Sequence, residues 1–136
     1  MTTPHWTMFF AGVCALLQCA LAALVIMRRA QTGIGFLDGG DAALLHRIRA
    51  HGNFAETVPM ALLLLALLEM QGLGRMWIIS LGVVLLLGRL LHALSLLTNN
   101  AAWSRRGGML LTLNMLSIAA VLCIGLAAEH LARLWQ

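Results

Sequence analysis

The sequence predicts an all-α membrane protein in which four transmembrane helices form a single bundle. Its 136 residues are 61% hydrophobic and only 10% charged, and the mean hydropathy is +0.90. A soluble domain is roughly half apolar and a quarter charged. Four apolar runs each reach the ~20 residues that cross the hydrocarbon core, and backbone groups in lipid must be satisfied within the segment, so these runs are expected to be helices. We therefore predict one domain over residues 1–136.

The four helices are expected to differ in where they carry polar residues. The first and the fourth contain 20-residue stretches without a charge, Met8 to Met27 and Met109 to Ala128. The second has a polar first half and a leucine-rich second half, and the third carries Arg89 and His92 inside its apolar run. Short breaks separate them, and the glycines in these breaks favour irregular backbone. The expected helices cover about residues 5–29, 41–71, 75–98 and 106–133.

The first helix is expected to be retained, because MTTPHW lacks the basic residues of a signal peptide and the apolar run that follows is too long for its core. Small residues recur on it at Ala11, Ala15, Cys19 and Ala23. This pattern permits close helix packing in lipid, and the alternative is chance in an alanine-rich chain. The three cysteines match no metal or redox spacing, so we interpret them as packing residues and expect no metal.

The membrane orientation follows from the nine arginines, since the chain contains no lysine. Most of them flank the break after the first helix and the break before the fourth. The opposite side carries Arg75 and Arg133, with Glu69 and Glu129 beside them. The positive-inside rule therefore predicts both basic loops in the cytoplasm and both termini outside. Nucleic-acid binding is not expected despite the net charge of +4, because the basic, aromatic-interleaved surface that it needs is missing.

The stretch RIRAHGNFAETVP brings polar groups to the start of a leucine-rich run. At about 100° per residue, one side of this helix carries His46, Arg49, Asn53 and Glu56, and the other carries Arg47 and His51. A polar stripe that enters the bilayer must face protein or water rather than lipid. Pro59 removes a backbone donor and frees the carbonyl of Ala55, so it is expected to kink the helix, unless it is an ordinary membrane proline.

A second polar group lies inside the third helix, where Arg89 and His92 are three residues apart and share a face. An arginine so far from the helix ends indicates a functional site, and the alternative is a structural ion pair with Glu56. Together with the loop arginines, these groups are expected near one membrane face. They predict a basic crevice suited to a ligand with two or more carboxylates, an amine and amide groups, although positive-inside topology alone also explains the loop arginines.

The same stretch resembles the signature of the MAPEG superfamily, the membrane-associated proteins in eicosanoid and glutathione metabolism. The family pattern is Arg-Ala-x-x-Asn-x-x-Glu-x-x-Pro, and every position of it is present, at Arg49, Ala50, Asn53, Glu56 and Pro59. GRLLHALS resembles part of the family's third helix and SRRGGMLLT the start of its fourth. The resemblance therefore covers essentially the whole chain.

The resemblance implies a homotrimer that binds glutathione at each subunit interface, near the cytoplasmic side. It implies that Arg105, with Arg106 as the alternative, is catalytic, because positive charge beside sulfur favours the thiolate. Relatives often carry tyrosines on the second and third helices, whereas this chain has no tyrosine and has Thr57 and Leu96 at those positions. The implied glutathione-binding residues are Arg28, Arg29, Arg49, His51, Asn53, Glu56, Arg89 and His92, of which His51 and Arg28 or Arg29 can belong to a neighbouring subunit's site.

The resemblance thus predicts an integral membrane glutathione S-transferase, with glutathione as co-substrate. Its partners would be membrane lipids and a lipophilic electrophile or hydroperoxide, the latter through peroxidase activity. A non-catalytic lipid- or glutathione-binding scaffold is the alternative. A small four-helix drug exporter is a third reading, but such exporters tend to rely on a carboxylate in the first helix, and Met8 to Met27 contains none. The short loops indicate a bacterial inner membrane.

Overall fold

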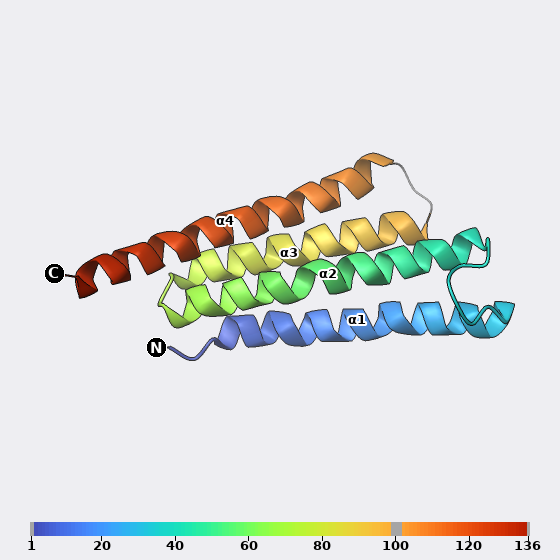
Figure 1. Cartoon of the computed structure of the whole chain (residues 1–136), viewed down its shortest axis with the longest axis horizontal. Coiled ribbons are helices and arrows are strands. Elements are labelled where there is room, and N and C mark those ends of the chain that lie inside the picture. The colour runs from blue at the N-terminus through green and yellow to red at the C-terminus, as the bar shows by residue number, and fades with distance from the viewer. Residues whose placement is uncertain (1, 99–101, 136) are drawn as a thin grey trace.

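Four long helices run alternately up and down in a computed structural model that describes residues 2–98 and 102–135 (Figure 1). All four are long and apolar enough to cross a membrane, and helix is the one regular secondary structure among the described residues. The predicted all-α, four-helix architecture is therefore confirmed. The helices are α1 His5–Thr32, α2 Ala42–Met70, α3 Arg75–Leu97 and α4 Ala102–Leu134.

Two helix ends differ from the expected ones. α1 continues to Thr32 because Gly33 adopts the left-handed conformation, with φ of 70°, and donates its N–H to the carbonyl of Arg29. α4 begins at Ala102 rather than near residue 106, and Arg105 and Arg106 lie in its first turns. Part of the expected break before this helix, residues 99–101, lies outside the described residues.

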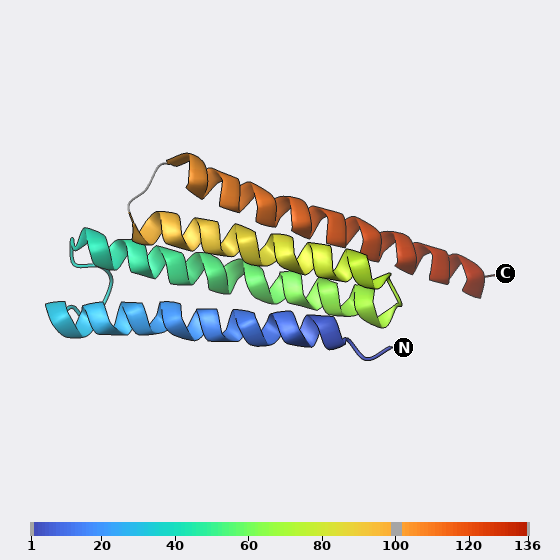
Figure 2. The ribbon, with the colours of Figure 1, turned by 180° about the vertical axis from the view of Figure 1, so that it is seen from behind.

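The alternation of the helices gives the bundle two different ends (Figures 1 and 2). The loop between α1 and α2, the end of α3 and the start of α4 lie at one end, which we call the loop end. Both termini and the turn between α2 and α3 lie at the other, the terminal end. The arginine pairs that flank the two connections, at positions 28–29 and 105–106, are thus gathered at the loop end, as their spacing along the chain predicts.

The buried core changes composition along the bundle. In the terminal half, all four helices contribute to one apolar cluster, which includes Phe10, Leu65, Leu85 and Met115. In the loop half, the buried apolar cluster is drawn from α1, α2 and α3. Here α4 packs on α3 through backbone instead: a Cβ added to Gly108 would lie 2.6 Å from the carbonyl oxygen of Gly88, closer than real Cβ atoms come to another atom.

The terminal end is fixed by a carboxylate that caps the start of α1. Glu69, near the end of α2, accepts hydrogen bonds from the backbone N–H groups of Trp6 and Thr7 at 2.9 and 2.8 Å, and from the Thr7 hydroxyl at 2.7 Å. The first N–H groups of a helix have no partner within it. Glu69 therefore satisfies donors that would otherwise be exposed to an apolar environment, and joins α1 to α2.

Large apolar side chains are exposed on the outer surface of all four helices. Leu16 on α1 and Ile124 on α4 are 74% and 69% exposed, whereas half of the spanning segment of α3 is buried. Exposed apolar patches of this extent indicate contact with lipid or with other copies of a protein. α3 is thus the central helix, and three of its polar side chains, Arg89, His92 and Ser95, are at most 6% exposed.

Candidate functional site

A basic cavity lies between α2, α3 and α4 in the loop half, where the apolar core no longer includes α4. Its volume is about 410 Å³, within the range of small-molecule sites. Three arginines and two histidines contribute positive or potentially positive charge, and among the described residues no carboxylate lines it. The lining side chains are Leu45, His46, Arg49, Asn53, His92, Leu96, Arg105, Arg106 and Met109.

The polar stripe on α2 contributes all of the polar side chains that this helix adds to the lining. His46, Arg49 and Asn53 lie on the cavity wall, and the side-chain amide of Asn53 donates to the carbonyl of Arg49 at 2.8 Å. Glu56, one turn further along, is exposed and is not part of the lining. Helical spacing therefore predicts the direction of the stripe, but a single chain does not bring the Glu56 carboxylate into the cavity.

Arg89 is buried behind the cavity and joins three helices. It is 3% exposed. Its Nε donates to the Thr112 hydroxyl at 2.8 Å, Nη1 donates to the Thr57 hydroxyl at 3.2 Å and to the Asn53 carbonyl at 3.3 Å, and Nη2 donates to the Gly108 carbonyl at 3.4 Å. Four of the five N–H groups of a guanidinium are thus engaged by neutral acceptors.

These hydrogen bonds contradict the alternative in which Arg89 forms a structural ion pair with Glu56. Within residues 2–98 and 102–135, Arg89 makes no ion pair. It lines a smaller apolar cavity against α1 and not the basic one. A buried charge without a partner carboxylate is costly. The hydrogen bonds of Arg89 offset this cost, and they define the packing of α2, α3 and α4. Direct contact of Arg89 with glutathione stays a prediction.

The arginines at the end of α1 close the loop to α2. Arg28 forms an ion pair with Asp41 at 2.7 Å, and Arg29 donates to the carbonyls of Ile34 and Leu37, both at 3.1 Å. Asp41 also accepts the N–H of Leu44 at 2.6 Å and so caps α2. The hydrogen bond from Arg28, followed by that from Leu44, lowers the pKa of Asp41. Neither arginine lines the basic cavity of its own chain.

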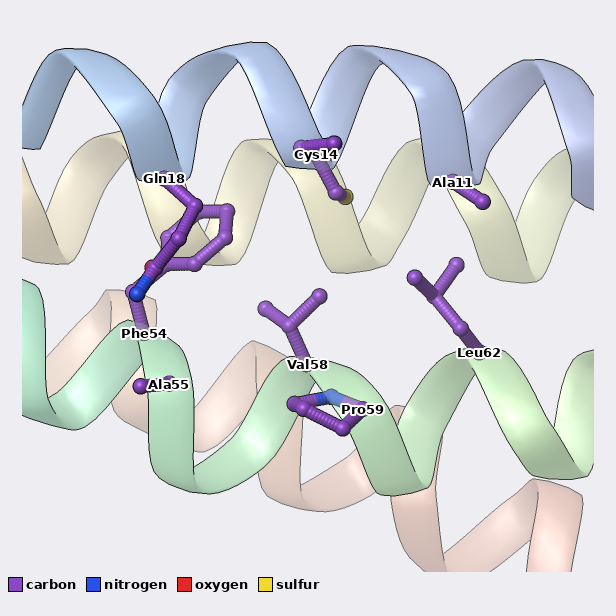
Figure 3. A pocket seen from close by; sticks show the side chains of 9 residues that line it. Ala11, Cys14, Gln18, Phe54, Ala55, Val58, Pro59 and Leu62 are labelled. Carbon is purple, nitrogen blue, oxygen red and sulfur yellow. The ribbon is translucent and has the colours of Figure 1, made fainter.

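His51 faces the side of α2 opposite to the cavity, as its helical position predicts. Its Nε2 lies 2.9 Å from the side-chain nitrogen of Gln18 on α1. Beside this pair, α1 and α2 form an apolar groove of about 310 Å³. Figure 3 shows Cys14, Val58, Pro59 and Leu62 along it. α2 runs unbroken through Pro59.

His92 is the most shielded polar side chain of the cavity lining, at 6% exposed. Its Nδ1 lies 3.2 Å from the carbonyl oxygen of Arg105. Its Nε2 is buried and has no hydrogen-bond partner in the part of the chain that the structure describes. The sequence identifies His92 but not this carbonyl, nor Thr112, which holds Arg89. The closest sequence signal is the glycines at 88 and 108, which permit close approach of α3 and α4.

The structure thus brings together Arg49, Asn53, His92, Arg105 and Arg106 and leaves Glu56 at the margin. Among the described residues, no group of three or more His, Cys, Asp or Glu side chains could hold a metal ion. A cavity with several guanidinium groups, an amide and an imidazole is suited to an anionic ligand that also offers hydrogen-bond donors.

Comparisons with known proteins identify the family of the chain. The chain is similar to "Inner membrane protein YecN" from Escherichia coli strain K12 and from Escherichia coli O6:H1. Each is 36% identical over 99 residues, which cover 72% of this chain and 75% of the relative. The model of the MAPEG family matches residues 7–125, from α1 to the last third of α4. The chain therefore belongs to the MAPEG family.

Proposed function

We propose that this protein is an integral inner-membrane glutathione S-transferase that joins the glutathione thiolate to lipophilic electrophiles. The observation that carries the proposal is the basic cavity of about 410 Å³. Its lining includes Arg49, Asn53, His92, Arg105 and Arg106. Family membership supports the same chemistry. Lipid hydroperoxides are a second substrate class, since a thiolate also reduces a peroxide bond.

The functional groups of glutathione match those of the cavity. Its two carboxylates suit guanidinium groups, which bind carboxylates through paired hydrogen bonds, and its peptide amides suit Asn53. Arg105, or Arg106 in its place, would stabilise the thiolate by positive charge, which lowers the pKa of a thiol. Binding also holds the thiolate beside an electrophile that enters from the bilayer, which removes much of the entropic barrier to a bimolecular reaction.

A homotrimer would complete the site. Arg28, Arg29 and His51 lie outside the basic cavity of their own chain, so they can be ligands only in the cavity of a neighbouring copy. Glu56, exposed at the margin, would meet the ligand's amine once a second subunit covers it. The loop end, where the basic cavity lies, would face the cytoplasm.

Two measurements on protein in mild detergent test this proposal. Mass measurement should give about three times the 14.7 kDa chain. Glutathione at about 100 times its Kd should stabilise the fold by about 2.7 kcal/mol, seen as a rise in Tm, and turnover of an aryl halide should depend on glutathione. A dominant monomer would remove the intersubunit site. Glutathione that neither shifts Tm nor supports turnover would refute the transferase.

A non-catalytic scaffold remains the second candidate, and the apolar groove between α1 and α2 favours it. The lack of any tyrosine hydroxyl points the same way. This reading predicts that glutathione or a lipid raises Tm while no thiolate forms and no electrophile is consumed.

A further inference from the structure

The imidazole of His92 is locked in one tautomer by the backbone of α4. Its Nδ1 lies 3.2 Å from the carbonyl oxygen of Arg105, and a carbonyl accepts hydrogen bonds but never donates them. Nδ1 therefore carries a proton, and in the neutral ring the lone pair lies on Nε2. The helix contact enforces this position, because a Cβ at Gly108 would lie 2.7 Å from the backbone nitrogen of His92.

This lone pair has no partner among the residues that the structure describes. Nε2 is buried, and a buried acceptor left unpaired costs about 1–3 kcal/mol. An orphaned buried polar atom in a native structure needs an explanation, of which a catalytic role is one. Because His92 lines the basic cavity, a ligand held there is the partner that the geometry offers, and it must bring an acidic hydrogen.

The arginines of the cavity cannot receive that hydrogen. A guanidinium stabilises a thiolate by its charge, but it is already fully protonated at physiological pH. His46 is the other titratable base on the lining. It is only half-buried, whereas His92 is almost fully enclosed and held by a carbonyl on its far nitrogen.

On this basis we propose that His92 is the catalytic base of the transferase: Nε2 takes the thiol proton of the bound ligand. The inference rests on the proposed function. In the step, the S–H bond breaks and an Nε2–H bond forms, and both bonding electrons stay on sulfur. The thiolate then attacks the electrophile, and the imidazolium returns its proton to the leaving group or to water. Histidine activates other nucleophiles in the same way, with a third group that orients the ring.

The positive groups that face His92 favour a protonated imidazole only when a thiolate lies beside it. Arg89 lies on its own helix, Arg105 and Arg106 approach from α4, and His46 and Arg49 approach from α2. An additional isolated positive charge among these groups is unfavourable. Transfer from a neutral thiol to a neutral imidazole creates an ion pair and no net charge, so the bound thiolate compensates the imidazolium.

A proton count on the full chain in detergent tests the inference. The probe is glutathione, titrated by calorimetry in two buffers of different ionisation enthalpy, while ultraviolet absorbance counts the thiolate. If His92 keeps the proton, wild-type protein forms thiolate with almost no proton released to solvent. If charge alone lowers the thiol pKa, about one proton is released per thiolate. S-methylglutathione, which has no thiol proton, corrects for other linked ionisations.

The matched variants are His92→Gln and His46→Gln. Glutamine places an amide near the Nε2 position, which accepts a hydrogen bond but takes no proton. His92→Gln should bind glutathione with similar affinity, release about one proton per thiolate, and lose about 100-fold in turnover of an aryl halide at neutral pH, the lower end of general-base effects. His46→Gln should, like wild type, form thiolate with almost no proton released to solvent.

The possible results distinguish the role of His92 as a base from the proposed transferase activity. Release of one proton per thiolate by the wild type would overturn the role of His92 while the transferase stands, and so would a His92→Gln variant with unchanged turnover. The absence of glutathione binding or thiolate in the wild type would refute the proposed function and the base with it. The wild-type proton count needs no variant, so misfolding of His92→Gln leaves the test decisive.

Discussion

Substitution of Gly108 by alanine is expected to separate α4 from α3. The added Cβ would lie 2.6 Å from the carbonyl oxygen of Gly88 and 2.7 Å from the backbone nitrogen of His92. Comfortable carbon–oxygen contacts are about 3.3–3.6 Å, so the helices must move apart locally by roughly 0.7–1 Å. Both neighbours are backbone atoms in helices, and no side-chain rotation relieves the contact.

The cost of this movement can be bounded. Overpacking of a tight interior costs about 1–3 kcal/mol, while replacing a glycine within a helix by alanine returns up to about 1 kcal/mol of helix propensity. Gly107→Ala is the matched control, because a Cβ there would have nothing within 4 Å. The difference between the two variants isolates the steric effect and should be about 1–3 kcal/mol, or roughly 3–10 °C in Tm for a chain of this size.

Thermal unfolding in detergent measures this difference, and glutathione titration follows it. Gly108→Ala should also weaken glutathione binding, since the shift moves the Arg105 carbonyl away from His92 and the Gly108 carbonyl away from Arg89. If Gly108→Ala and Gly107→Ala unfold at the same temperature, the direct backbone contact between α3 and α4 is not present in the protein.

Three further predictions concern charged groups. Glu56→Gln should weaken glutathione binding by about 1.5–3 kcal/mol, as a charge-assisted hydrogen bond is lost, whereas Arg47→Ala, on the other side of α2, should cost much less; equal losses in calorimetry would contradict the stripe. Arg105→Ala removes the guanidinium but keeps the backbone carbonyl, so it should raise the pKa of the bound thiol by about one to two units and slow aryl halide turnover about 10- to 100-fold; if Arg106→Ala has this effect instead, the roles are exchanged. The pKa of Asp41 is lowered by its ion pair, so its contribution to stability is complete above the ordinary value of 3.8 and is lost as pH falls through the lower folded value. Asp41→Asn should therefore lower Tm at neutral pH, by a margin that closes in a pH series below about pH 4; a margin that does not change with pH would mean that the ion pair is not stabilising.

The helices and the polar stripe were predictable because both are local properties. Hydropathy over ~20 residues identifies a span, and the helical period alone places Arg49 and Asn53 on one side and His51 on the other. The sequence also correctly predicts that the loop arginines lie at one end of the bundle, since consecutive spans in an up-and-down bundle bring alternate connections together.

The partners of the buried polar groups were not predictable in the same way. Glu69 was expected on the same side of the membrane as Arg75, but no partner was predicted for it, and it caps α1 more than sixty residues away. Arg89 was expected to meet either a ligand or Glu56, and its partners include Thr112 and the Gly108 carbonyl. Both outcomes depend on the rotation and height of one helix relative to another, which hydropathy does not specify.

The position of α4 therefore determines what the chemistry of the cavity can be. The same two turns of α4 supply the carbonyl that fixes the His92 tautomer, the carbonyl and hydroxyl that hold Arg89, and the side chains of Arg105 and Arg106. Close approach is possible because glycine occurs on both helices, at Gly88 and Gly108. Alanine at either position would change the packing and the acid–base geometry together. Gly88 and Gly108 thus influence the geometry of the site as a ligand-contacting residue would, although they offer the ligand no functional group.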